Sequence, residues 1–134
     1  MTAEERAVLA ANAAFYRAFA ERDIAAMDAL WARDVPAACI HPGWHVLNGR
    51  DNVMASWRGI LAGVPPAIRC SDPVARIAGS AAFVVCTESL EAGELVATNV
   101  FVREGGEWKI AHHHAGPVAT ADEDDGPPRS GFLN

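Results

Sequence analysis

The chain has 134 residues, about half of them hydrophobic, which is enough for one domain with a buried core. Its formal net charge is −6. A nucleic-acid-binding protein is expected to present a basic face, so we expect no nucleic-acid partner. No apolar run approaches the ~20 residues that cross a bilayer, and the charged N-terminal segment is unlike a signal peptide. These features predict a cytoplasmic protein without a membrane partner.

The first part of the chain predicts two helices. Residues 2–5 spell a T-x-x-E capping box, which marks the start of a helix over residues 3–20. Apolar residues recur on one face of this helix at helical spacing, with Asn12 as an exception. Asp23 is a good N-cap for a second helix, which we expect to close at Asp34.

A short hairpin follows these helices. Residues 35–41 and 44–48 have the composition of strands, and the Pro-Gly pair between them predicts a two-residue loop. In such a hairpin the residues that flank the loop are cross-strand neighbours, so we expect His41 and Trp44 to share one face. His45 would then point to the other face.

The rest of the chain predicts a third helix and a sheet. Asn48 would cap the helix and Gly63 would end it, because two prolines follow. Beyond it, turn signals separate four long strands that an antiparallel meander would join. We expect these strands over residues 67–78, 81–91, 94–104 and 107–115.

Helices first and a meander last is an α+β order. We expect three N-terminal helices packed on the concave face of a strongly curved, mainly antiparallel sheet, with a conical cavity between them. This domain would occupy residues 1–117. Residues 118–134 are acidic and rich in proline and glycine, which predicts a disordered C-terminal tail.

Three sequence segments, in this order along the chain, are similar to those of a known protein family. They read "FYRAFAERDIAAMDALWA", "GRDNVMASWRGIL" and "ATNVFVREGGEWKIAHHHAGP". The chain thereby resembles the NTF2-like superfamily, in particular its SnoaL-like, ketosteroid isomerase-like branch. The resemblance implies a cone-shaped α+β barrel and a homodimer through the outer sheet face. It leaves the activity open, since this fold serves isomerases, cyclases, dehydratases and proteins without catalysis.

Ketosteroid isomerases can be compared with the chain position by position. They place a tyrosine donor on the first helix, and Tyr16 falls at that place or one residue from it. Where they carry an aspartate base on the first strand, this chain has Cys39 or His41. Asn99 is the nearest polar candidate for their second donor. The resemblance therefore implies the scaffold of these enzymes without their known carboxylates.

The last strand ends in three histidines, where SnoaL-type cyclases carry an acidic residue. Alternation along a strand predicts a buried face and an opposite face that carries His113. The predicted buried face holds Trp108, Ile110, His112 and His114. A buried histidine could act as a general base, because its ordinary pKa of about 6.5 suits proton transfer at neutral pH. The alternative is a histidine that is hydrogen-bonded to neighbouring strands in a structural role.

These histidines also raise the question of a metal. His112 and His114 could supply two ligands and His41 a third, with Glu88 as a nearby carboxylate. Nothing in the spacing fixes the distance from His41 to His114, and we predict no native metal. Three cysteines lie in apolar stretches without metal-type spacing, which predicts buried reduced thiols. They are Cys39, Cys70 and Cys86.

Other residues are candidates for the pocket wall. Large aromatic residues suit an apolar ligand site, and the candidates are Trp31, Trp44 and Trp57. Asn99 is a polar residue in a central strand, so it either ties strands together or contacts a ligand. Glu88 would become a candidate acid or base if it faced inward, because burial would raise its pKa. We expect it to face outward.

The sequence thus predicts a domain that binds a small molecule. The first hypothesis is an isomerase, cyclase or dehydratase that works by acid–base catalysis without a cofactor. His41 and either His112 or His114 would move protons, and Tyr16 and Asn99 would donate to an oxyanion. The alternative is a ligand-binding or dimerisation domain without catalysis, in which the histidines are structural.

Overall fold

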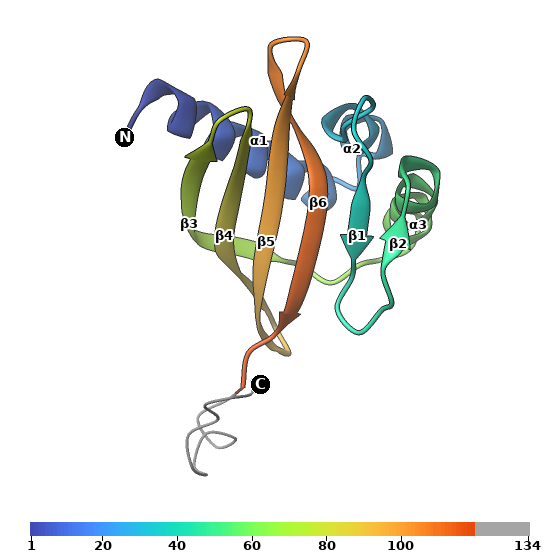
Figure 1. The fold of residues 1–134 in the computed structure, drawn as a ribbon. Coiled ribbons are helices and arrows are strands. Elements are labelled where there is room, and N and C mark those ends of the chain that lie inside the picture. The colour runs from blue at the N-terminus through green and yellow to red at the C-terminus, as the bar shows by residue number, and fades with distance from the viewer. Residues whose placement is uncertain (120–134) are drawn as a thin grey trace.

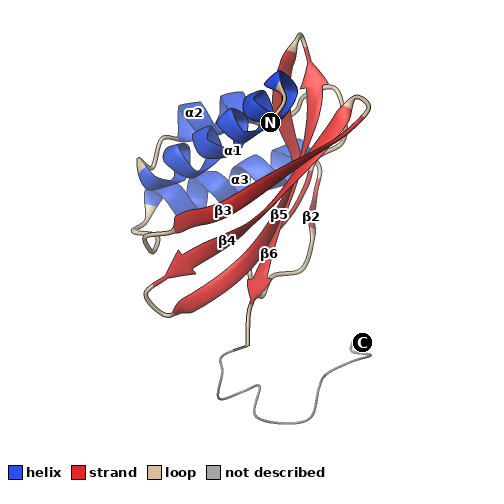
Figure 2. Cartoon of the chain, turned by 90° about the vertical axis from the view of Figure 1, so that its left-hand side faces the viewer, coloured by secondary structure: helices blue, strands red, loops and turns tan. Residues whose placement is uncertain are grey.

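The computed structural model describes residues 1–119, so most of the predicted tail at 118–134 lies outside the described residues. Three helices cover one face of a six-stranded, curled and open sheet (Figures 1 and 2). The elements are α1 (Ala3–Ala20), α2 (Ile24–Leu30), β1 (Ala38–Ile40), β2 (Leu47–Asn48), α3 (Arg50–Ala62), β3 (Arg69–Ala78), β4 (Ala81–Leu90), β5 (Gly93–Glu104) and β6 (Glu107–Pro117). This arrangement confirms the predicted α+β class.

The sheet has the strand order β2-β1-β6-β5-β4-β3. Strands β3 to β6 form the predicted antiparallel meander. Strand β1 pairs with β6 in parallel, and β2 pairs with β1 antiparallel. The parallel pair brings the first histidine-bearing segment next to the last strand, as Figure 1 shows for β1 and β6.

Helix α1 has the predicted bounds and the predicted capping box. The Thr2 hydroxyl accepts from the Glu5 amide at 3.1 Å, and the Glu5 carboxylate accepts from the Thr2 amide at 2.8 Å. The helix packs its apolar face on the sheet. Asn12 and Tyr16, one turn apart, are buried in that face. Their polar atoms therefore need partners inside the protein.

The other two helices differ from the prediction at one end each. Asp23 caps α2 through the Ala26 amide at 3.0 Å, as predicted, but α2 ends at Leu30 rather than at Asp34. Trp31 then takes an extended conformation and forms a parallel bridge with a residue of β6. At the start of α3 the N-cap is Gly49, whose φ of +87° favours glycine, instead of Asn48.

The hairpin loop is longer than predicted and spans residues 41–46. The Trp44 amide donates to the His41 carbonyl at 2.9 Å, which closes a turn with Pro42 and Gly43 at its centre. Proline followed by a glycine at φ +82° is the pattern of a type II turn. Type II turns splay the strands that they join, so pairing starts further from the turn. His41 and Trp44 are neighbours as expected, with ring centroids 4.8 Å apart.

A β-bulge in β6 changes which histidines face the helices. Ile110 pairs with Phe101 and His112 pairs with Val100, so Ala111 is an extra residue on β6. An extra residue shifts the alternation of side chains by one position. The inward residues are Trp108, Ile110, Ala111, His113 and Ala115.

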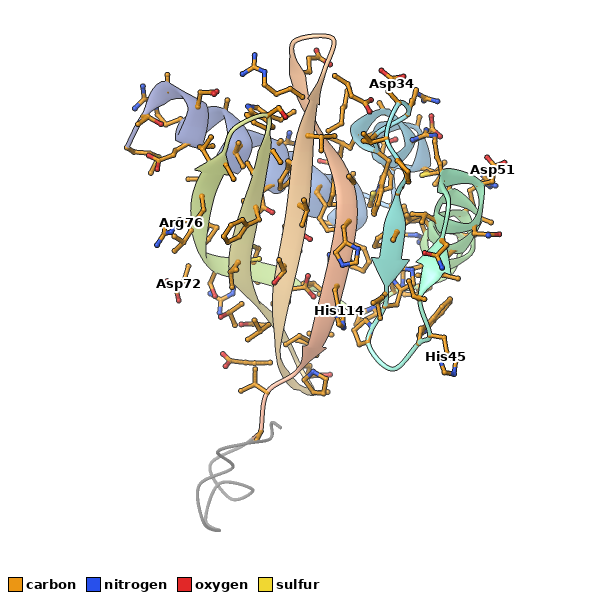
Figure 3. All side chains as sticks on the ribbon, viewed as in Figure 1. Asp34, His45, Asp51, Asp72, Arg76 and His114 are labelled. Atoms are coloured by element: carbon orange, nitrogen blue, oxygen red, sulfur yellow. The ribbon has the colours of Figure 1, made fainter. Side chains whose placement is uncertain are left out.

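The predicted faces of the histidine strand are therefore wrong beyond the bulge. His113 is buried, with 3% of its surface exposed, although we expected it on the opposite face. His114 is exposed, and His112 is half-buried with Nδ1 3.1 Å from the Ala38 carbonyl oxygen. Figure 3 labels His114 beside β6, and His45 in the loop between β1 and β2.

The core lies between the helices and the concave sheet face. Its largest fully buried side chains include Trp31, Phe15, Phe101 and Met27. All three cysteines are free thiols, as predicted, and two of them are buried. Within residues 1–119 no helix is long and apolar enough to cross a membrane.

Candidate functional site

A pocket of about 380 Å³ opens at one end of the core. This volume lies in the range of small-molecule sites. Its lining consists of Phe15, Tyr16, Phe19, His41, Pro42, Trp44, Trp57, Ile60, Pro66, Ile68, Glu88, Leu90, Leu95 and His113. Most of these side chains are apolar. The polar members are deeply buried: Glu88 and His113 are each 3% exposed, whereas Trp44 is 49% exposed.

Glu88 and Tyr16 form a short polar contact at the inner end of this pocket. Alternation along β4 places Glu88 on the inner face, where the Tyr16 hydroxyl of α1 donates to its Oε2 at 2.6 Å. Desolvation raises the pKa of Glu88, and the bond from Tyr16 opposes this shift. Desolvation and the neighbouring carboxylate raise the pKa of Tyr16 above its usual range. Tyr16 therefore remains a protonated donor to Glu88.

A chain of hydrogen bonds continues from Tyr16 to β6 through Asn99. The Nδ2 atom of Asn99 donates to the Tyr16 oxygen at 3.2 Å and to Asn12 Oδ1 at 2.8 Å. Its Oδ1 lies 2.6 Å from His113 Nδ1 across the β5–β6 pair. This network explains why the otherwise apolar face of α1 carries Asn12, since the fully buried Asn99 needs an acceptor there.

His113 is held as a neutral imidazole. Complete burial and the positive charge that neighbouring histidines would carry lower its pKa to about 3. Its Nδ1 hydrogen points to Asn99. Nε2 has no hydrogen-bond partner among residues 1–119, and the ring lines the pocket beside Phe15, with ring centroids 5.1 Å apart. His113 therefore offers the pocket a nitrogen lone pair.

His41 directly follows β1 and also lines the pocket. Ser56 on α3 donates its hydroxyl hydrogen to the Val53 carbonyl at 2.7 Å, so its oxygen accepts from His41 Nε2 at 2.9 Å. The ring packs edge-on against Trp57, at 4.8 Å between centroids. Desolvation lowers the pKa of His41, so this imidazole is also neutral near pH 7.

The structure brings four of the predicted site residues to the pocket. Tyr16, His41, Trp44 and Trp57 line it. Asn99 lies behind Tyr16 and His113 and does not line the cavity. Trp31 is fully buried in the core and is not part of the lining.

The two histidines predicted for the inner face do not belong to this pocket. His112 and His114 lie on the outer side of β6, beyond the bulge at Ala111. In their place, the lining contains His113 and Glu88. Sequence reasoning placed both outside. The one local signal for the bulge is the pair of apolar neighbours Ile110 and Ala111, which breaks the alternation.

One thiol contacts one of the histidines considered as metal ligands. Residues 1–119 contain no group of three or more His, Cys, Asp or Glu side chains placed to hold a metal. Cys39 Sγ lies 3.8 Å from His41 Nε2 and 3.9 Å from Nδ1. Burial raises the pKa of the Cys39 thiol to about 12, so it stays a protonated thiol near neutral pH.

Comparisons with known proteins agree on one fold family. The model of the SnoaL-like domain family matches residues 8–120. A solved structure from Streptomyces avermitilis, named a "putative dehydratase" of the NTF2-like family, is 34% identical. It matches with a TM-score of 0.80 over 87% of this chain and 97% of that chain. This assignment supports a fold that binds small molecules.

Two further relatives carry different names. A structure from Thiobacillus denitrificans, named a "putative calcium/calmodulin-dependent protein kinase type II association domain", is 35% identical, with a TM-score of 0.74. The match covers 83% of this chain and 94% of that chain. The F-box protein SKIP8 of Arabidopsis thaliana is 27% identical over 126 residues, covering 90% of this chain. The chain spans 54% of the length of that curated relative.

Proposed function

Because the chain belongs to the SnoaL-like domain family, we propose that its pocket binds a small apolar molecule and catalyses acid–base chemistry on it without an organic cofactor. The observation that carries this proposal is Glu88. It is a carboxyl group with 3% exposure in an apolar pocket, held through one oxygen by Tyr16. Its other oxygen, Oε1, has no hydrogen-bond partner among residues 1–119 and is available to a ligand.

The environment of Glu88 suits proton transfer. A general acid or base works best when its pKa lies near the working pH, and burial moves the pKa of Glu88 upward from 4.5 toward that range. The Tyr16 hydroxyl fixes the orientation of the carboxylate and limits this shift. In this proposal Glu88 is the catalytic residue and Tyr16 is a positioning residue.

The reaction class that we propose is the removal of water from an apolar substrate. The Glu88 carboxylate takes a proton from a carbon atom, and the electron pair of that C–H bond forms a C=C bond. The neighbouring C–O bond breaks, and the departing hydroxyl group leaves as water after it receives the proton from Glu88. The similarity to the NTF2-like protein named a putative dehydratase supports this class. Isomerisation and cyclisation use the same first step.

The histidines have a binding role in this proposal rather than the proton-transfer role first predicted. His41 and His113 are both neutral because desolvation lowers their pKa values, and His113 would protonate only near pH 3. Neutral imidazoles form hydrogen bonds with a ligand and orient it. His112 and His114 lie outside the pocket and take no part in this chemistry.

The proposal is tested with a panel of β-hydroxy ketones on fused-ring or cyclic skeletons. The protein is incubated with each compound in D₂O, and mass spectrometry follows loss of water and uptake of deuterium at the carbon beside the carbonyl. We expect turnover of at least one compound, and a loss of about 10²–10⁴-fold in Glu88→Gln. Glu94→Gln changes an exposed glutamate of β5 and serves as the matched control. Turnover that Glu88→Gln leaves unchanged contradicts the proposal.

A second candidate function is assembly, and the outer sheet face favours it. Four large apolar side chains are exposed there on neighbouring strands: Val74, Phe83, Val85 and Val96. Exposed apolar patches of this kind mark interaction surfaces. The similarity to the Thiobacillus denitrificans protein, which is named an association domain, supports the same proposal. We expect the partner to be a second copy of this chain, and such a dimer is compatible with catalysis in the pocket.

A further inference from the structure

The inner end of the pocket is defined by two hydrogen-bond acceptors. Glu88 Oε1 and His113 Nε2 have no partner among the described residues, and both side chains are 97% buried, with 3% exposure each. The two groups come from different strands, β4 and β6, yet they line one cavity. Polar atoms that face a cavity are satisfied by a ligand or by water.

The acceptor state of His113 follows from the hydrogen-bond chain behind it. Tyr16 gives its hydroxyl hydrogen to Glu88, so the Tyr16 oxygen accepts from Asn99 Nδ2. The second hydrogen of Asn99 Nδ2 goes to Asn12. The remaining amide atom, Oδ1, is an acceptor and faces His113 Nδ1 at 2.6 Å, so Nδ1 must carry the hydrogen. A neutral ring with its hydrogen on Nδ1 has a bare Nε2.

The other polar groups at the inner end of the cavity do not supply a donor, and the Trp44 indole belongs to the exposed mouth. The Nε2 hydrogen of His41 goes to Ser56, and the hydroxyl hydrogen of Tyr16 goes to Glu88. The Trp57 indole nitrogen is buried without a hydrogen-bond partner, so this residue presents its ring to the cavity rather than its N–H group. An acceptor on a ligand would meet the lone pair of His113 or the carboxyl group of Glu88.

The outer part of the pocket is apolar. It includes the exposed Trp44 and Pro66 and the half-buried side chains of Ile60, Ile68, Leu90 and Leu95. A ligand that fits both the polar inner end and the apolar outer part of the pocket must therefore enter with its polar group first. Its hydrocarbon body then lies at the mouth. Burial of that body supplies affinity, and the inner end supplies specificity.

We infer that the ligand is an apolar molecule with a hydroxyl group at its inner end, and that this hydroxyl donates to His113 Nε2. Asn99 is the positioning residue that keeps Nε2 free of hydrogen. This inference rests on the proposed function and deepens it, because it assigns recognition of the substrate's hydroxyl group to His113. A hydroxyl beside Glu88 is also the group that a water-removing enzyme must reach.

The test compares two compounds of one skeleton, 1-tetralol and 1-tetralone. At the same ring position, 1-tetralol carries a hydroxyl group that can donate a hydrogen bond, whereas 1-tetralone carries a carbonyl group that can only accept one. Isothermal titration calorimetry on the full chain is expected to show roughly tenfold tighter binding of the alcohol, the difference that one hydrogen bond makes. Equal binding, tighter binding of the ketone, or binding of neither compound overturns the inference.

Two variants test whether His113 causes the tighter binding of the alcohol. His113→Phe keeps a planar ring and removes both nitrogens, so we expect the preference for the alcohol to disappear. His114→Phe makes the same change on the exposed neighbour and should keep the preference. If His113→Phe fails to fold, nitrogen NMR of the wild-type histidine rings decides the same point: a hydrogen on Nδ1 and a bare Nε2 supports the inference, and a hydrogen on Nε2 overturns it.

The result is distinguishable from a failure of the proposed function. A protein that removes water from β-hydroxy ketones through Glu88 but binds 1-tetralone as tightly as 1-tetralol keeps the function and loses the inference. A protein that selects the alcohol but shows no turnover with any compound keeps the inference as a binding property and loses the catalysis.

Discussion

The Tyr16 hydroxyl on α1 donates to Glu88 Oε2 on β4 at 2.6 Å, across 72 positions of the sequence. This bond joins the helical layer to the sheet at the inner end of the pocket. The same oxygen of Tyr16 accepts from Asn99, which in turn is bonded to His113. Four residues from α1, β4, β5 and β6 therefore depend on one another for their orientation, and a change at one of them affects the others.

The first prediction concerns the bond itself. Tyr16→Phe removes the donor and leaves Glu88 Oε2 without a partner in a buried site. We expect a loss of about 1–3 kcal/mol in the free energy of unfolding at pH 8, and a smaller loss at pH 4.5, because a carboxylate accepts more strongly than a carboxylic acid. Urea denaturation at the two pH values measures this difference. Equal stability of the variant and the wild type at pH 8 would contradict the assigned bond.

The second prediction concerns the cost of burying Glu88. Its folded pKa is raised above the ordinary value of 4.5, so the folded state holds the proton more tightly than the unfolded state. Stability is therefore lost as pH rises from about 4.5 through the folded pKa. Glu88→Gln keeps the shape and removes the charge, so its stability relative to the wild type should increase over this pH range.

The same denaturation series carries its own control. Glu94→Gln removes an exposed carboxylate, and its difference from the wild type should stay nearly constant over the same pH values. A Glu88→Gln variant that behaves like Glu94→Gln would mean that Glu88 is not desolvated.

The third prediction concerns acid destabilisation through His113. Its folded pKa is about 3, against an ordinary value of 6.5. A histidine with a lowered pKa contributes stability that is complete above pH 6.5 and is lost as pH falls toward 3, by up to about 1.4 kcal/mol per pH unit. His113→Gln should remove this part of the slope. His114→Gln, on the exposed face, should leave the slope as it is, and equal slopes for all three proteins would refute the burial of His113.

The fourth prediction concerns assembly. Val85→Glu places a charge in the apolar patch on the outer sheet face, where Val85 is 39% exposed. We expect a homodimer for the wild type and a monomer for this variant, as measured by size-exclusion chromatography with light scattering. Val64→Glu introduces the same change at a position that is 92% exposed after α3, and it should remain dimeric. A monomeric wild type would end the dimer proposal.

The architecture could be predicted because its signals are local. The capping box at Thr2, the glycine at the end of α3 and the glycine turns between strands are each read from a few neighbouring residues. Tyr16 could be placed on the inner face because helical spacing put it beside other buried residues of α1. The order of helices first and a meander last then predicted the layers, and the family resemblance agreed with it.

The inner end of the pocket could not be predicted, because it depends on contacts that are distant in sequence. The residues before Glu88 are apolar on both faces of β4, so the alternation does not show which face is buried. A carboxylate is then expected to face water unless a partner is known. That partner, Tyr16, comes from another element. His113 was assigned to the wrong face because an unbroken alternation was assumed, whereas the bulge at Ala111 shifts it by one residue.

The desolvation of the Glu88 carboxyl group in the pocket can be measured by carbon NMR of that side chain. The wild-type protein is titrated from pH 3 to pH 9, with Glu88→Gln used to assign the resonance. We predict a midpoint clearly above 4.5 that rises further in Tyr16→Phe. A midpoint at or below 4.5, unchanged by Tyr16→Phe, would show that Glu88 is neither desolvated nor bonded to Tyr16.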